Sequence, residues 1–394
     1  MEIFFWTCVF IVFYVFVGYG MLISILAKIK GTKPIETLGD EDLPEVTFLV
    51  AAYNEEEIIE EKIKNTLALD YPKDKLKIKI VTDGSNDGTN DIVSRFSEAE
   101  LCFKPERAGK IAAVNRVMPS VESALTVFTD ANVMINKDGL KNMIRHFQSN
   151  LVGAVSGEKT VLSKEEDSAS SSGEGFYWKY ESFLKRKDAE WNTLVGSAGE
   201  LFAIRTHLYE NIDTNTLIED FVMTMKLSAK GYKVAYEPQA LAMETGSANI
   251  EEETKRKVRI SAGGIQAVIM LLPLLNLFKY GKLTFQYISH RALRWTLMPL
   301  ALVGAFTSIF FLAPQGWPYD LIMRLELIFA ILALAGYAMR NGETKIKALY
   351  IPYYFIYMHY CVVLGWIKYF RGKQQVTWDK AKRATPLQQV QSLN

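Results

Sequence analysis

The sequence predicts an α/β protein with a mostly parallel sheet, helices on both faces of that sheet, and flanking transmembrane helices. Short β-prone runs alternate with helical patterns in the central part of the chain, and this alternation is typical of parallel sheets with crossover helices. Apolar runs of nearly membrane-spanning length lie towards both ends of the 394 residues. These observations predict one globular domain held in a membrane at both ends.

Residues 3–27 form the first apolar run and include no charged residue. About 20 apolar residues are enough to cross the hydrocarbon core of a bilayer. A secretory signal peptide would have a basic start and a small-residue cleavage site, whereas the only charged residue ahead of this run is Glu2. We therefore expect a retained N-terminal transmembrane anchor over residues 1–30.

Three more apolar runs lie towards the C-terminus, at residues 292–313, 321–339 and 348–370, and each approaches spanning length. We expect transmembrane or re-entrant helices over residues 291–370, followed by a basic tail over residues 371–394. Membrane lipids are therefore expected partners of the chain.

Basic residues predict the orientation of the chain in the membrane. Lys28, Lys30 and Lys33 follow the first anchor, and residues 255–259 include four more basic side chains ahead of the second apolar region. Lys and Arg concentrate on the cytoplasmic side of membrane proteins. We therefore expect a multi-pass protein of the plasma or inner membrane with a cytosolic central domain.

The end of the chain conflicts with this orientation. A full span over residues 348–370 would leave the basic tail on the opposite side of the membrane. We therefore expect this last run, interrupted at Pro352, to be partly re-entrant or interfacial. Residues 261–290, with an apolar first part that includes Pro273, are expected to form interfacial helices.

The bulk composition excludes several classes of function. The net charge of +1 gives no overall basic field, so we expect no nucleic-acid partner. Cys8 and Cys361 lie in apolar runs and Cys102 is isolated, so the three cysteines form neither a disulfide framework nor a zinc-site spacing. His146 and His207 have no partner at metal-ligand spacing, and we interpret both as structural.

The central block, residues 40–260, is expected to form the globular domain. A polar stretch at residues 163–175 predicts a surface loop, and the amphipathic pattern after it predicts a helix over residues 176–190. Ligands bind beyond the carboxyl ends of the strands in sheets of this kind. The earlier elements of the block, in chain order, are strand 46–53, helix 55–68, strand 76–82, helix 89–99, helix 109–117 and strand 124–129.

Polar residues at strand ends and helix starts are the candidates for chemistry. Asp83, in VTDGSNDGT, serves either the geometry of a turn or hydrogen bonding to a nucleotide base or ribose. Gly109 and Lys110 open a helix, where backbone N–H groups and a lysine suit a phosphate, although the spacing of a Walker P-loop is missing.

Two acidic motifs follow further along the chain. Asp130 and Asn132 end a strand, and positions two apart point to the same side of a strand, so they suit one shared ligand such as a divalent ion; an ordinary turn is the alternative. Glu219 and Asp220 begin a helix, where acids are favoured by the helix dipole. Beside a sugar donor, Asp220 would instead accept a proton from an acceptor hydroxyl as general base.

Seven motifs, taken in order, resemble those of family 2 glycosyltransferases, most closely the membrane-bound branch that includes cellulose, chitin and hyaluronan synthases. The resemblance covers residues 44–264, and the flanking helices fit the same layout. The motifs are VAAYNEEEIIEEKI, VTDGSNDGT, GKIAAVN, FTDAN, GSAGELFAIR, IEDFVMTMKLSAKGYKVAYEP and KRKVRI.

The resemblance implies a GT-A fold that transfers a sugar from a nucleotide donor, commonly a UDP-sugar, with Mg²⁺ or Mn²⁺ on the diphosphate. It also implies a role for each residue that matches a motif position. The implied residues are Ala52, Tyr53, Glu55, Asp83 and Lys110 for the nucleotide-sugar, Asp130 and Asn132 for the metal and diphosphate, Gly199, Glu200 and Glu219 for the acceptor, and Asp220 for the general base.

The chain departs from the family pattern after the implied base. The synthases carry Gln-x-x-Arg-Trp there, whereas this chain has Arg256 to Ile260. Arg259 still suits bidentate binding of the diphosphate of the nucleotide-sugar, but the Trp that would stack beneath the acceptor sugar is Ile260. Trp378, in QVTWDKAKR, is similar to the gating segment of those synthases and is a further acceptor-side candidate.

The resemblance implies an inverting reaction, because a single displacement by an acceptor hydroxyl needs a base but no carboxylate nucleophile. The leading hypothesis is elongation of a polysaccharide at the membrane. The alternative is transfer of one sugar to a polyprenyl-phosphate or lipid-linked oligosaccharide, since about four apolar segments are few for a channel in one protomer. A partner subunit would also complete such a channel. A non-catalytic scaffold is the third hypothesis, and the intact set of acids argues against it.

Overall fold

The computed structural model describes residues 1–31, 34–162, 170–246, 249–340 and 346–372, with the backbone alone at residues 170–177. The chain divides into two compact units. Of the described residues, 31, 34–162, 188–246 and 249–253 belong to the sheet unit, and 1–30, 170–187, 254–340 and 346–372 belong to the helical unit.

Among the described residues, eight strands form the sheet of the sheet unit, in the order β3-β2-β1-β4-β7-β6-β8-β5. Strands β3, β2, β1 and β4 run parallel, whereas β7 is antiparallel to both of its neighbours, β4 and β6. The predicted α/β fold class is confirmed, with a sheet that is mixed beyond β4. The strands are β1 Val46–Ala52, β2 Leu76–Asp83, β3 Ala99–Lys104, β4 Leu125–Asp130, β5 Met134–Ile135, β6 Val152–Leu162, β7 Leu201–Arg205 and β8 Lys233–Thr245.

Helices cover both faces of the sheet, which is why every residue of β1 is buried. Successive side chains of a strand point to opposite faces. Phe48 accordingly packs in one apolar core with Ile63 of α3, and Leu49 packs in the other with Val114 of α5 and Met223 of α8. The helices of the sheet unit are α3 Ile59–Leu67, α4 Thr89–Val93, α5 Lys110–Val117, α6 Gly139–Ile144 and α8 Glu219–Ala229.

The predicted helix over residues 89–99 is wrong in its second half. Helix α4 ends at Val93, and from Ala99 the chain forms β3, the edge strand that pairs with β2. The backbone of β3 gains its hydrogen bonds from a neighbouring strand that is distant in sequence. Such pairing overrides local helical preference and is not visible in a short window of sequence.

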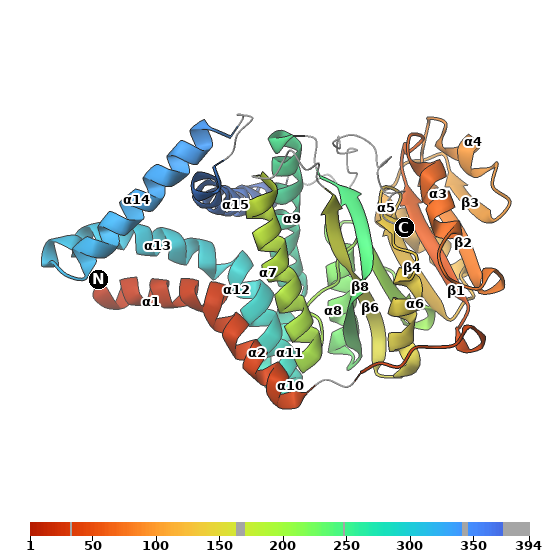
Figure 1. Cartoon of the computed structure of the whole chain (residues 1–394), viewed down its shortest axis with the longest axis horizontal. Coiled ribbons are helices and arrows are strands. Elements are labelled where there is room, and N and C mark those ends of the chain that lie inside the picture. Colours follow the sequence, from red (N-terminus) through yellow and green to blue (C-terminus); the bar gives the residue numbers. More distant parts are fainter. Residues whose placement is uncertain (32–33, 163–169, 247–248, 341–345, 373–394) are drawn as a thin grey trace. The chain divides into compact units, whose positions relative to one another are not determined.

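Four helices among the described residues are long and apolar enough to cross a membrane, and they correspond to the four predicted runs: Glu2–Lys30, Leu297–Gln315, Tyr319–Ala338 and Lys347–Phe370. The first combines α1 and α2 through a π-helical turn. The helices of the helical unit are α1 Glu2–Phe13, α2 Tyr19–Lys30, α7 Ser170–Trp191, α9 Ile250–Met270, α10 Leu277–Tyr280, α11 Lys282–Tyr287, α12 Leu293–Trp295, α13 Leu297–Leu312, α14 Tyr319–Ala338 and α15 Lys347–Phe370 (Figure 1).

Two expectations about helix boundaries are wrong. Helix α7 begins at Ser170, so the predicted loop does not extend to residue 175, and residues 163–169 lie outside the described residues. Once a helix has formed, each further residue adds one hydrogen bond at little cost, which favours extension into the Ser-rich stretch. Helix α15 runs unbroken through Pro352, near its N-terminal end, so the predicted interruption does not occur.

The expected interfacial helix at residue 261 begins earlier. Helix α9 starts at Ile250, after Asn249 accepts a hydrogen bond from the backbone N–H of Glu252 at 2.9 Å. The first turn is acidic, which suits the positive end of the helix dipole. The chain then forms short helices from Leu272 onward.

Candidate active site

The carboxyl ends of three neighbouring strands meet at one edge of the sheet. In the register of these strands, Ala52 of β1 lies opposite Thr82 of β2, and Ala51 lies opposite Asp130 of β4. The turns that follow β1, β2 and β4 therefore share this edge, where ligands bind in sheets of this kind. The sequence predicted this meeting of the Asp83 and Asp130 turns.

The turns after β1 and β2 are joined by hydrogen bonds. The Asn54 side chain donates to Asn86 Oδ1 at 2.8 Å and accepts from the Asn86 backbone N–H at 3.0 Å. The backbone N–H of Glu55 donates to Thr89 Oγ1 at 2.8 Å. Of the predicted pocket residues, Ala52 packs into the apolar core, and Glu55 is held in place through its backbone N–H.

Tyr53 forms a cation–π pair with Arg107. The central guanidinium carbon lies 3.8 Å from the centroid of the tyrosine ring. Arg107 also lies against Gly84, where an added Cβ would approach it to 3.0 Å. Arg107 was not predicted from the sequence, because no motif spacing marks it. Together the ring and the guanidinium offer a flat, positively charged surface that suits a base or a phosphate.

The Asp83 carboxylate holds the loop that precedes α5. Oδ1 accepts the backbone N–H of Ala108 at 2.9 Å, and Oδ2 accepts that of Gly109 at 2.6 Å. Gly109 has a φ of 95°, a conformation that favours glycine. The backbone N–H groups at the helix start of Gly109 and Lys110 were predicted to suit a phosphate, but that of Gly109 is bonded to Asp83. Asp83 thus fixes the start of α5, and Lys110 is the first residue of that helix.

Lys110 lies between two carboxylates. Its ammonium is 2.8 Å from Asp130 Oδ1 and 3.1 Å from Glu219 Oε1. Burial alone would lower the pKa of Lys110, but Asp130 and Glu219, with Asp220, raise it well above its usual range. Lys110 is therefore charged, and it joins the end of β4 to the start of α8.

Asp220 is a half-buried carboxyl in the first turn of α8. Burial and the nearby carboxylates of Glu219 and Glu200 raise the pKa of Asp220 to about 7, against the opposing charge of Lys110. A carboxyl group with a pKa near neutrality can both accept and release a proton under ordinary conditions. Such a pKa suits the general-base role predicted for Asp220, which stays a prediction.

The loop before β7 brings Gly199 against Asp220. An added Cβ on Gly199 would lie 3.3 Å from the Asp220 carboxyl carbon. The backbone N–H of Ser197 donates to Thr224 Oγ1 at 3.1 Å, and the Ser197 hydroxyl donates to the Asp220 carbonyl at 3.1 Å, so the loop is tied to α8. Gly196, with a φ of 82°, passes so close to Phe221 that no side chain fits there.

Glu200, which follows Gly199 in the chain, belongs to a second group of ion pairs. Lys159 of β6 is buried and forms ion pairs with both Glu200 and Glu244. Lys159 and Glu244 were not predicted from the sequence, because their meeting depends on the pairing of β6 with β8 across about 80 residues of chain. Lys159 therefore balances Glu200 and Glu244, as Lys110 balances Asp130 and Glu219.

A family model described as Glycosyltransferase like family 2 matches residues 44–263, more than half of the chain. The chain belongs to this family. The predicted membership of this family is confirmed, and the protein is a family 2 glycosyltransferase.

Curated relatives of this glycosyltransferase include poly-beta-1,6-N-acetyl-D-glucosamine synthases. The one from Staphylococcus aureus (strain COL) is 28% identical over 243 residues, 58% of this chain and 57% of that protein. The one from Staphylococcus epidermidis is 26% identical over 234 residues, 57% of this chain and 55% of that protein. The glycosyltransferase thus spans somewhat more than half of the length of these relatives.

A solved structure is similar over nearly the whole glycosyltransferase. It is the mannosyltransferase PcManGT from Pyrobaculum calidifontis in complex with GDP-Man and Mn²⁺, with a TM-score of 0.67 and 22% sequence identity. The match covers 94% of this chain and 100% of that one. The predicted GT-A fold is confirmed by this likeness.

The residues at the end of β4 fit a divalent metal in part. Among the described residues, no group of three or more His, Cys, Asp or Glu side chains would hold a metal ion. Mg²⁺ usually takes one or two carboxylates and completes its shell with phosphate oxygens and waters. The Asp130 carboxylate, with the Asn132 amide two residues on, matches such a donor set beside a bound diphosphate.

The remaining predicted residues belong to other segments of the chain. Arg259 is on α9, in the helical unit, and Trp378 lies outside the described residues. His146, interpreted as structural, is buried with Nε2 2.9 Å from Glu237 Oε2. His207 lies in a single 3₁₀ turn, Thr206–Leu208.

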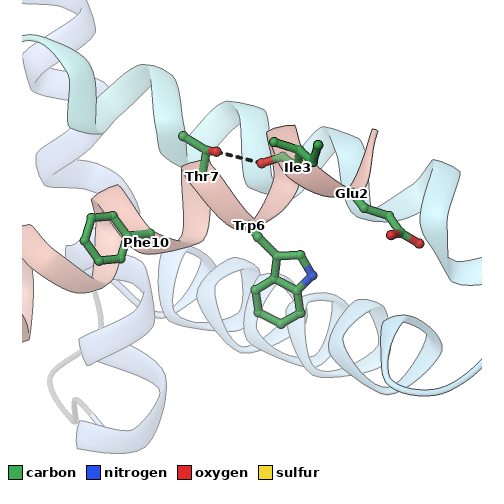
Figure 2. Close-up of a pocket in the computed structure, with 5 residues that line it drawn as sticks. All are labelled: Glu2, Ile3, Trp6, Thr7 and Phe10. Atoms are coloured by element: carbon green, nitrogen blue, oxygen red, sulfur yellow. Dashed lines mark hydrogen bonds between the residues drawn. The ribbon is translucent and has the colours of Figure 1, made fainter.

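A surface hollow of about 460 Å³ lies along α1 in the helical unit (Figure 2). It is lined by Glu2, Ile3, Trp6, Thr7 and Phe10, residues on one side of a candidate membrane span. The Thr7 hydroxyl donates to the Ile3 carbonyl at 2.7 Å, so its polar atom is used within the helix. This hollow contains no cluster of charged groups and is distinct from the candidate active site in the sheet unit.

Proposed function

We propose that this glycosyltransferase is an inverting enzyme that transfers a sugar from a nucleotide-sugar, a UDP-sugar, to a growing polysaccharide at a membrane. The observation that carries the proposal is the position of Asp220. It lies beside Lys110, which is paired with Asp130 and Glu219, and against the loop at Gly199. Its raised pKa, about 7, suits a general base at neutral pH.

The reaction that we propose is one displacement. The acceptor hydroxyl oxygen forms a bond to the anomeric carbon of the donor, and the bond from that carbon to the diphosphate oxygen breaks. The hydroxyl proton passes to the Asp220 carboxylate. Attack on the face opposite the leaving group inverts the anomeric configuration, so an α-linked donor gives a β-linkage, and no second carboxylate is needed as nucleophile.

The donor would bind along the edge formed by β1, β2 and β4. Tyr53 and Arg107 offer a surface for the base, and Ala52, Glu55 and Asp83 would border the same pocket. Lys110 would neutralise part of the charge on the diphosphate, with Arg259 as a second cation. Asp130, together with Asn132, would hold Mg²⁺ or Mn²⁺, which supplies charge neutralisation to the leaving diphosphate when bound.

The acceptor would approach from the side of Gly199, Glu200 and Glu219, with Trp378 as a further contact. Three carboxyl groups on this side favour an uncharged hydroxyl over an anionic acceptor. A phosphate is already ionised near neutral pH and needs no base. These facts favour a sugar hydroxyl, on a polysaccharide or on a lipid-linked oligosaccharide, over a polyprenyl-phosphate.

Transfer of a single sugar to a lipid-linked acceptor is the second candidate. It is favoured by Ile260, which stands where the synthases carry a stacking Trp, and by the small number of candidate spans, four among the described residues. We propose for either case a multi-pass protein of the cell membrane with the sheet unit in the cytosol and membrane lipids around the four spans. A partner subunit would complete a channel if the product is a long chain.

A panel of nucleotide-sugars, incubated with the full chain in detergent, tests the proposal through UDP release and product size. Release from one UDP-sugar, with a product of many sugars, supports the polysaccharide hypothesis. A mass increase of one sugar on a lipid acceptor supports the second candidate. No release by the wild type from any donor, with any acceptor, would refute both.

A further inference from the structure

Lys62 is a fully buried lysine that the proposed reaction does not use. It lies on α3 with an exposed fraction of 0% and packs against Phe48, whose ring centroid is 5.3 Å from Nζ. Burial lowers the pKa of Lys62 to about 7, and the charge of Asp130 opposes that shift. Placing an amine in an apolar core is costly, so its contacts have to offset that cost.

The contacts of Lys62 bracket the turn that contains Asp130 and Asn132. Its ammonium donates to Thr129 Oγ1 at 3.3 Å and also to the carbonyl of Val133. Within the turn, the backbone N–H of Val133 donates to the Asp130 carbonyl at 3.2 Å. One side chain therefore holds both ends of a five-residue turn from the side of the core.

The same network reaches two neighbouring segments. The Thr129 hydroxyl, which accepts from Lys62, donates to the backbone carbonyl of Glu200 at 2.9 Å, in the acceptor-side loop. One helical turn after Lys62, Asn65 exchanges two hydrogen bonds of 2.9 Å with the backbone of Ile135. Helix α3 thus supports the segment from Thr129 to Ile135 through two side chains.

We infer that Lys62 is a positioning residue that sets the geometry of the Asp130 and Asn132 side chains through the backbone on either side of them. This inference rests on the proposed function, because it takes Asp130 and Asn132 to bind the metal and the diphosphate of the donor. Groups that orient metal ligands from behind typically change metal affinity about 10- to 100-fold when they are removed.

Lys62→Met tests the inference, because methionine fills similar space without the ammonium. Lys79→Met is the matched control: Lys79 is also a buried lysine, but its ammonium contacts Glu100 at 2.6 Å and Ser120 at 3.5 Å. Thr129→Val is the second variant, because it removes the hydroxyl that joins Lys62 to the Glu200 loop while keeping the shape of the side chain.

Two measurements on the full chain in detergent separate positioning from plain stability. The first is Mn²⁺ affinity in the presence of UDP, from the loss of the free Mn²⁺ signal in electron paramagnetic resonance. The second is hydrogen exchange of the backbone amides from residues 129 to 135. For Lys62→Met we expect Mn²⁺ affinity weakened about 10-fold or more and faster exchange in this segment, with Lys79→Met unchanged in both.

The outcomes are distinct. If the wild type binds no Mn²⁺, the metal part of the proposed function fails, and exchange alone then decides the role of Lys62. If the wild type binds Mn²⁺ and a folded Lys62→Met binds it equally well, the inference is overturned. If Lys62→Met does not fold, Thr129→Val decides by the same two comparisons.

Discussion

Gly199 lies directly against the Asp220 carboxyl group, so that a methyl group added to Gly199 would be 3.3 Å from Asp220 Cγ and 3.4 Å from Oδ2. This contact is so tight that a side chain at residue 199 would press on the carboxyl group of the proposed base. It also explains why the glycine belongs to the site even though it carries no functional group.

Gly199→Ala should lower turnover while the protein remains folded. The added methyl group would displace the Asp220 carboxyl group by a few tenths of an ångström. Small displacements of a reacting group can cost up to about 100-fold in rate, and we expect at least about a 10-fold fall in kcat. Gly246→Ala is the control, since its added methyl group would meet only Val161 at 3.7 Å. Equal UDP release by both variants would contradict the prediction.

Activity should rise with pH through the pKa of Asp220, about 7, because only the ionised carboxylate accepts a proton. The rate should level off above that pH. Glu219→Gln removes a carboxylate that raises this pKa, so the rising part of the profile should move to lower pH. The measurement is kcat/KM for UDP release between pH 5 and 9 at saturating metal. A profile that is identical in the variant and the wild type would exclude Asp220 as the titrating group.

Lys110→Met should weaken donor binding. The substitution leaves Asp130 and Glu219 facing each other without the ammonium that lies 2.8 Å and 3.1 Å from them. Hydrogen bonds to charged groups contribute about 1.5–3 kcal/mol, so KM for the donor should rise about 10- to 100-fold. Lys226→Met, at an exposed position of α8, is the control and should leave KM unchanged. An unaltered KM in Lys110→Met would place the diphosphate elsewhere.

Asp130→Ala should abolish UDP release, because Asp130 is the only carboxylate of its turn. Asn132→Asp should retain activity and require less metal, since a second negative oxygen strengthens binding of a hard cation. Titration of UDP release with Mn²⁺ measures both effects. If Asn132→Asp loses turnover while it stays folded, Asn132 contacts the donor sugar instead of the metal.

The central strands and the places where they end were predictable because their signals are local. The β-prone runs at β1, β2 and β4, and the polar turns after them, need only a short window of sequence. The antiparallel insertion of β7 and the edge strand β3 were not predictable in this way. Their pairing partners are distant in sequence, and no residue within the strand itself specifies the partner.

Asp130, Lys110 and Asp220 could be named as candidates from the sequence because residue type and position coincide there, and the structure brings the three together. Lys159 and Arg107 were missed because their partners are brought to them only by the fold. The burial of Lys62 could have been predicted from the sequence. Its spacing from Ile59, Ile63 and Thr66 places all four on one face of the helix, and the structure buries that face.

The hydrogen bond from the Gly109 N–H to Asp83 has a consequence for the choice of donor. Because Lys110 follows Gly109 directly, we expect a change at the Asp83 carboxylate to shift the cation that faces Asp130. If Asp83 borders the base, as we propose, a nucleotide with the wrong base would misplace the lysine that assists departure of the diphosphate. We expect nucleotide-sugars with the wrong base to bind but to turn over slowly. They should therefore act as competitive inhibitors of the correct donor.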